Sequence, residues 1–95
     1  MSDEAPKQPP SVYEHIALLL DQIASVSWQK LGLQPDIMTG KIEQNLPEAK
    51  VALDLAGYLA GVLEPQLDPD DQRKVKNLVH DLRLNYLHKS KEATD

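Results

Sequence analysis

The side chains of this sequence best suited to chemistry are four basic residues near its C-terminal end, Arg73, Lys76, His80 and Arg83. At about 100° per residue they fall on a narrow arc of one helix. Such an arc can contact phosphates, as in nucleic-acid-binding proteins. It can also be a solvated face that pairs with acidic residues of the same chain or of a second copy. We favour pairing, because no aromatic residue lies on the arc and the chain carries a net charge of −5.

Charge is unevenly distributed along the chain. Between Gln72 and Lys91 there are six basic residues and one acidic residue, a net charge of +5, so the rest of the chain carries −10. Opposite charges on separate parts of a small domain favour pairing within or between copies over a general attraction to nucleic acid. Nucleic-acid association through the basic face is therefore the alternative function, and we expect it to be the less favoured one.

Other kinds of active site have little support in the residue types present. The chain has no Cys, which excludes a thiol nucleophile, a disulfide and a thiolate metal site. The histidines His15, His80 and His88 lack the spacing of a metal motif, and surface positions explain them better. No glycine loop for phosphates and no nucleophile beside a base is evident. The sequence predicts no catalytic residue, no cofactor, no metal and therefore no enzyme.

The stretch that organises the chain is an expected helix over residues 46–64. Asn45 followed by Glu48 resembles a capping box, and Pro47 suits a first helical turn. Pro65 ends the helix because proline cannot continue the hydrogen-bond ladder. Its apolar residues cover about 220° of the helix surface, which indicates burial by neighbours on more than one side.

Two further helices flank this stretch. The first, over 12–31, begins with Ser11 and Glu14 as a capping box and ends at Gly32. Its apolar arc of about 200° is also wider than one neighbour requires. The third, over 69–89, begins with Asp68 as N-cap and Pro at the first position. Its apolar stripe consists of Val75, Leu78, Val79, Leu82 and Tyr86, whose neighbours along the helix face are three or four residues apart.

The remaining segments complete a single all-α domain over residues 11–90. Residues 33–44 form a long connection with several apolar side chains, which we expect to be an ordered loop folded back over the helices. We expect residues 1–10 to be a disordered tail and residues 91–95 to fray. No secretory signal or membrane-spanning stretch is evident, so the expected location is the cytoplasm.

Several short motifs of the chain resemble a bacterial family, domain of unknown function eighteen-forty-four. The similarity extends over roughly Val12 to Leu87 and depends on Leu31-Gly32, Pro35, Thr39-Gly40, Leu46, Ala49-Lys50, Asp54-Leu55, Asp81-Leu82-Arg83 and Tyr86. Members usually carry a Lys-Thr-x-Gly-Asn-Leu-Thr-like link between the second and third helices, of which only Leu67 is matched here. The resemblance implies a bacterial, cytoplasmic, helical protein and implies no activity.

These observations together favour a protein–protein interaction or assembly module that acts as a homodimer. The wide apolar arcs exceed what a three-helix monomer can cover, and a chain without Phe has a thin core. Among the polar residues, we expect Asp54 to pair with Arg83 and Asp81 to orient a neighbouring side chain. The residues expected at the interface are Leu18, Trp28, Tyr58, Leu84 and Leu87.

Overall fold

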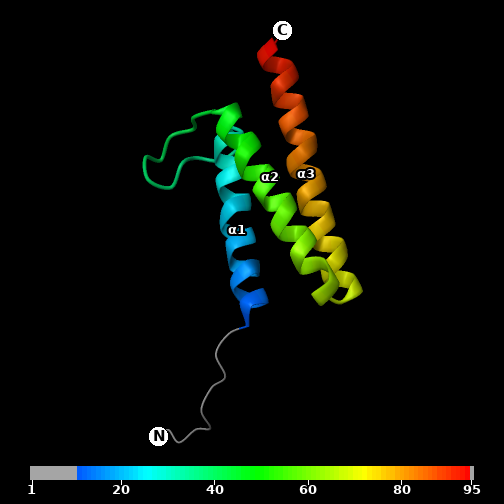
Figure 1. Ribbon diagram of the computed structural model, residues 1–95. Helices are drawn as coiled ribbons and strands as arrows, with labels where there is room; N and C mark the ends of the chain where they lie inside the picture. The colour runs from blue at the N-terminus through cyan, green and yellow to red at the C-terminus, as the bar shows by residue number, and fades with distance from the viewer. Residues whose placement is uncertain (1–10, 95) are drawn as a thin grey trace, which may run out of the picture.

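The computed structural model describes residues 11–94, which form three α-helices and no strand (Figure 1). These are α1 (Val12–Lys30), α2 (Leu46–Leu63) and α3 (Pro69–Thr94), with a short 3-10 helix, η1 (Glu64–Gln66), after α2. The predicted all-α, three-helix fold is confirmed, together with the long loop between α1 and α2. The predicted tail at residues 1–10 lies outside the described residues.

The three helices run up, down and up, and α2 lies between the other two (Figure 1). Its contact with α1 is the more extensive, its contact with α3 is smaller, and α1 and α3 touch each other only slightly. The short connection between α2 and α3, which includes η1, favours an antiparallel arrangement of these two helices. The helix with the widest apolar surface therefore takes the central place, as its sequence predicted.

Hydrogen bonds of the expected kinds define both ends of α1. The Ser11 hydroxyl accepts from the Glu14 N–H at 3.2 Å, and the Glu14 carboxylate accepts from the Ser11 N–H, so the capping box is complete. At the other end Gly32 adopts φ +81°, a conformation that favours glycine. The Leu33 N–H then donates to the Trp28 carbonyl, which closes a Schellman motif.

The start of α2 departs in one detail from the predicted capping box. The Asn45 side chain accepts from the Glu48 N–H at 3.1 Å, as expected for an N-cap. The Glu48 carboxylate, however, lies 3.0 Å from the Lys30 Nζ at the end of α1 instead of returning to the cap. The Asn45 N–H donates to the Lys30 carbonyl at 2.8 Å. The start of α2 is thus attached to the end of α1 by two separate contacts.

The boundaries of α3 were predicted correctly at its start and too short at its end. The Asp68 carboxylate accepts from the Asp71 N–H at 2.8 Å, which is the expected N-cap contact. The helix continues through the residues predicted to fray and reaches Thr94. No Gly or Pro interrupts that stretch, and Lys89 and Glu92 form an ion pair one turn apart at 3.6 Å.

The core lies on the side of α2 that faces α1 and α3. Small residues dominate there, and Ala49 and Ala56 have no exposed surface. Because alanine has only a methyl side chain, the buried alanines let the backbones of neighbouring helices approach α2 closely. Larger aliphatic side chains fill the space around the alanines: Leu20, Leu31, Leu53, Leu63, Val79 and Leu82.

The loop between α1 and α2 is ordered by Asp36 but does not cover the helices. The Asp36 carboxylate accepts from the N–H groups of Met38 and Thr39, at 2.7 and 3.1 Å. Its carbonyl accepts from the Gly40 N–H, with Gly40 at φ +71°. The prediction that the loop folds back over the bundle is wrong, because it projects away from the helices and leaves Met38 90 % exposed (Figure 1).

Candidate functional site

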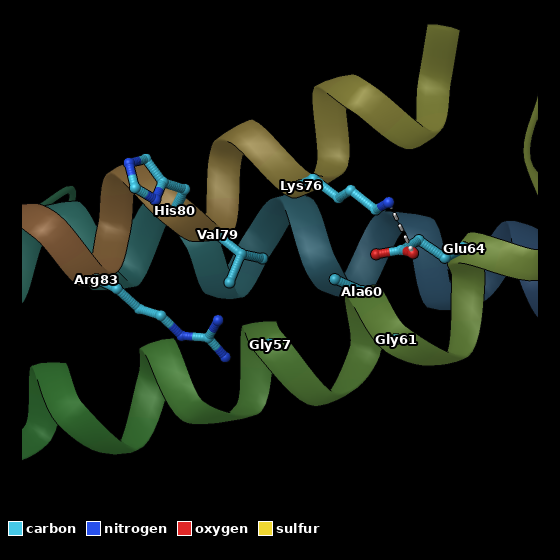
Figure 2. A pocket seen from close by; sticks show the side chains of 8 residues that line it. All are labelled: Gly57, Ala60, Gly61, Glu64, Lys76, Val79, His80 and Arg83. Atoms are coloured by element: carbon cyan, nitrogen blue, oxygen red, sulfur yellow. Dashed lines mark ion pairs between the residues drawn. The ribbon is translucent and has the colours of Figure 1, made fainter. Parts of the chain in front are cut away.

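Three of the four predicted basic residues lie together on one surface. The side chains of Lys76, His80 and Arg83 line a hollow between α2 and α3 (Figure 2). Arg73 does not, since its Nη2 lies 3.2 Å from the Asp70 carboxylate within the first turn of α3. The predicted basic face is therefore a group of three residues plus a separate local ion pair.

The floor of this cationic cleft is formed by the smallest residues of α2. Gly57, Ala60 and Gly61 face the basic side chains across a space of about 300 Å³ (Figure 2). These residues leave the α2 backbone accessible, because they project little or no side chain into the space. The full lining consists of Gly57, Ala60, Gly61, Glu64, Lys76, Val79, His80 and Arg83.

The Arg83 guanidinium lies directly over Gly57. A Cβ atom at Gly57 would lie 2.8 Å from the Arg83 Nη2, closer than such atoms approach each other, so the guanidinium occupies the place of a missing side chain. The prediction that Arg83 pairs with Asp54 is wrong. The Asp54 carboxylate instead lies 2.7 Å from the Lys50 Nζ, one turn away on the same helix. Within residues 11–94, Arg83 forms no ion pair.

The Lys50–Asp54 contact is local and exposed. The Asp54 carboxylate raises the pKa of the Lys50 ammonium through a hydrogen bond and charge attraction, and the Arg83 guanidinium opposes this slightly. An i, i+4 neighbour needs no tertiary packing to reach its partner. Asp54 therefore has its ion-pair partner within α2, and it does not line the cationic cleft.

The cleft keeps an excess of positive charge. Its only acidic lining residue is Glu64, whose carboxylate lies 3.8 Å from the Lys76 Nζ, a long and exposed contact (Figure 2). Arg83 remains without a carboxylate partner in the described chain. The arrangement can therefore accept an anionic group from outside.

Asp81 does not have the expected orienting role. It is exposed, and within residues 11–94 its carboxylate has no hydrogen bond or ion pair, while its backbone carbonyl accepts from the Asn85 side-chain amide at 2.8 Å. This contact is a local one within α3. The structure thus assigns neither Asp54 nor Asp81 to a bond between helices.

A second open surface, of different chemistry, extends over α1 and α2 on the side away from α3. It contains two adjoining apolar hollows of about 240 and 280 Å³, which share Ile23, Val26 and Leu55. We call this surface the α1–α2 face. The hydrophobic residues that line it are Leu19, Ile23, Val26, Val51, Ala52, Leu55 and Leu59.

The residues predicted for an interface are spread over different parts of the molecule. Trp28 is half-buried and packs against the core. Leu18 is 69 % exposed but stands roughly 160° around α1 from the buried Leu20, away from α2. Leu87 lines a separate hollow between α2 and α3. Tyr58 is 70 % exposed, on the outer side of α2.

Sequence reasoning missed the exposed stripe of α2 beside Tyr58. Val51 and Leu55 are 69 % and 44 % exposed, although the helix pattern assigned them to a generally buried arc. The positions 51, 55, 58 and 62 follow spacings of four, three and four, the pattern of a helix-packing seam. That spacing was visible in the sequence as a second stripe, separate from the buried alanines.

The described part of the chain contains neither a candidate metal site nor a helix that could span a membrane. No group of three His, Asp or Glu side chains between residues 11 and 94 is placed to hold a metal ion. None of the helices there combines the length and apolar character needed to cross a membrane.

Comparison with known proteins gives the chain a family. No curated protein and no solved structure matches it significantly. The matching family model covers residues 13–88, which contain nearly all of the three helices and both open surfaces. By this match the chain belongs to the family described as Domain of unknown function (DUF1844).

Proposed function

We propose that this protein is an assembly module that forms a homodimer through the α1–α2 face. The observation that carries the proposal is the apolar surface shared by α1 and α2. Its two hollows are lined by these two helices alone, and no other described part of the chain lines them. A surface of this kind, contiguous over two helices, is typical of an interaction site. Binding, and not catalysis, is the chemistry that such a face supports.

The spacing of the exposed residues fits a second pair of helices. On α1, Leu19, Ile23 and Val26 follow spacings of four and three, and α2 continues the pattern from Val51 to Leu55. Such seams pack against each other at shallow crossing angles in four-helix bundles. Two copies placed face to face would complete one, with each copy contributing α1 and α2.

Charge favours a second copy as the occupant. No charged side chain lines the first hollow. In the second, the charged residues are Lys30 and Glu48, which pair with each other at 3.0 Å. Two chains that each carry −5 can therefore meet here without opposing like charges. A two-fold axis makes the same surface serve both partners.

The test is the mass of the full chain by analytical ultracentrifugation over a hundredfold concentration range. We expect a dimer, and we expect Leu55→Glu to weaken it at least about tenfold, because a carboxylate would be buried without a partner. Leu18→Glu is the matched control, since it also replaces an exposed leucine but lies off the face. It should leave the dimer intact.

Two results would contradict the proposal. The first is a wild-type chain that remains monomeric at the highest concentration. The second is a dimer that Leu18→Glu dissociates and Leu55→Glu does not, which would move the interface to the outer side of α1. Circular dichroism of each variant shows that the helices are retained.

A further inference from the structure

The two glycines within α2, Gly57 and Gly61, have different surroundings, and packing explains only the first. Apart from proline, glycine is the least favourable residue within a helix. Gly57 has a reason to be small, because Arg83 occupies the space of its side chain. Gly61 has none of this kind, since a Cβ atom there would meet nothing within 4 Å. Both open onto the cationic cleft (Figure 2).

The opposite wall of the cleft presents basic side chains, of which Arg83 has no carboxylate partner in residues 11–94 and Lys76 has only a long contact. Lys76, His80 and Arg83 come from successive turns of α3 and border the same space. Arg83 forms no ion pair in residues 11–94, and Lys76 has only the long contact to Glu64 at 3.8 Å. The Arg83 guanidinium lies over Gly57 and the Lys76 ammonium points to Glu64, toward the two ends of the cleft (Figure 2). A guanidinium that has no carboxylate partner can form paired hydrogen bonds with the oxygens of a phosphate.

We propose that the cleft binds a small molecule that carries a phosphate group. The phosphate is held by Arg83 above Gly57, with Lys76 and His80 bordering the site, and the rest of the ligand lies against the α2 backbone at Gly61. Close approach of a ligand to a backbone is a common reason for glycine. This site faces α3, so it is separate from the proposed dimer face and does not depend on it.

Size and charge favour a small ligand over a nucleic acid. The space of about 300 Å³ is at the lower end of the range for small-molecule sites. A long polyanion would also meet Glu64 and the exposed carboxylates of Asp70 and Asp71 at the start of α3. Arg73, which would extend the basic surface, is paired with Asp70.

The test is a titration of the full chain, labelled with nitrogen-15, with inorganic phosphate and with adenosine monophosphate at constant ionic strength. We expect saturable shifts of the Gly57 and Gly61 amide signals, with adenosine monophosphate binding at least about tenfold more tightly than inorganic phosphate. Arg83→Gln removes the phosphate contact, and Gly61→Leu fills the cleft without a change of charge. Each should weaken binding at least about tenfold.

Arg73→Gln is the matched control, because it removes the same charge from α3 outside the cleft, and it should leave the affinity unchanged. Shifts that do not saturate, or that Arg73→Gln reduces as much as Arg83→Gln does, would show a general ion atmosphere and overturn the proposal. Tighter binding of an oligonucleotide than of the mononucleotide would overturn it in favour of nucleic acid. If Gly61→Leu dissociates a dimer and leaves phosphate binding intact, the cleft is a protein contact and the proposal is wrong.

Discussion

Small residues mark two rows along α2, and their surroundings are opposite. The alanine row, Ala49, Ala52 and Ala56, is buried against the neighbouring helices. The glycine row, Gly57 and Gly61, borders an open cleft. A small residue in a helix therefore allows close packing where a neighbouring helix fills the space, and it leaves the helix backbone accessible where the space is open. Only the structure distinguishes the two rows, because in both of them small residues recur at spacings of three or four.

Enlarging the alanine row should have the largest effect. Ala56 has no exposed surface, so Ala56→Leu forces extra carbons into a filled core. We expect a loss of about 1–3 kcal/mol in the free energy of unfolding. For a domain of this size each kcal/mol corresponds to roughly 4–8 °C in Tm. Urea denaturation measures the loss, and an unchanged midpoint would show that this row is not tightly packed.

Enlarging the glycine row should act in the opposite direction. Gly61→Ala places a methyl group in open space and removes an unfavourable helix residue, so stability should rise by about 0.5–1 kcal/mol. Gly57→Ala is the sharper comparison. There the methyl must displace the Arg83 guanidinium, and the gain should be smaller. A loss of stability in Gly61→Ala, measured by the same urea titration, would mean that the cleft is filled in solution.

Removing the side chain above the glycine row should have little effect on stability. Arg83 is exposed and forms no ion pair in the described residues, so Arg83→Ala should change the free energy of unfolding by no more than about 0.5 kcal/mol. Thermal denaturation checks this value. A large fall in Tm would support the predicted ion pair between Asp54 and Arg83, and it would argue that Arg83 has a structural role instead of a ligand-binding one.

The smallest effect concerns the ion pair that joins the ends of α1 and α2 beside the alanine row. Hydrogen bonding and attraction by Glu48 raise the pKa of the Lys30 ammonium. A raised pKa in the folded state means that the contribution to stability is complete at neutral pH and disappears as the pH rises through that pKa. Glu48→Gln should therefore lower the Lys30 pKa in an NMR titration, and an unchanged value would contradict the pairing.

The helices were predictable because their ends are determined by local chemistry. The Ser11 capping box, the Gly32 conformation and the Asp68 N-cap each involve residues within a few positions of one another. The end of α3 was the exception, since no glycine or proline marks a stop before Thr94.

The open surfaces were only partly predictable. Three of the four basic residues come together because they lie on one helix, whereas the cleft they line also requires α2 to present its glycines to α3. The predicted pairing of Asp54 with Arg83 was wrong because Lys50, one turn away on the same helix, forms the ion pair with Asp54. Exposure of Val51 and Leu55 depends on how α2 is rotated between its neighbours, which a single helix pattern does not determine.

The central position of α2 also determines which parts of the molecule unfold together. Because α1 and α3 scarcely touch, each is held mainly by α2, and the unfolding of α2 removes the support of both. The end of α3 behaves differently: in its described part no buried residue follows Leu82, and the helix projects beyond the other two (Figure 1). Its last turns can open by themselves. Amide hydrogens there should exchange with solvent while those of α2 exchange only when the whole domain unfolds, so the chain consists of one cooperative unit with an independently fraying arm.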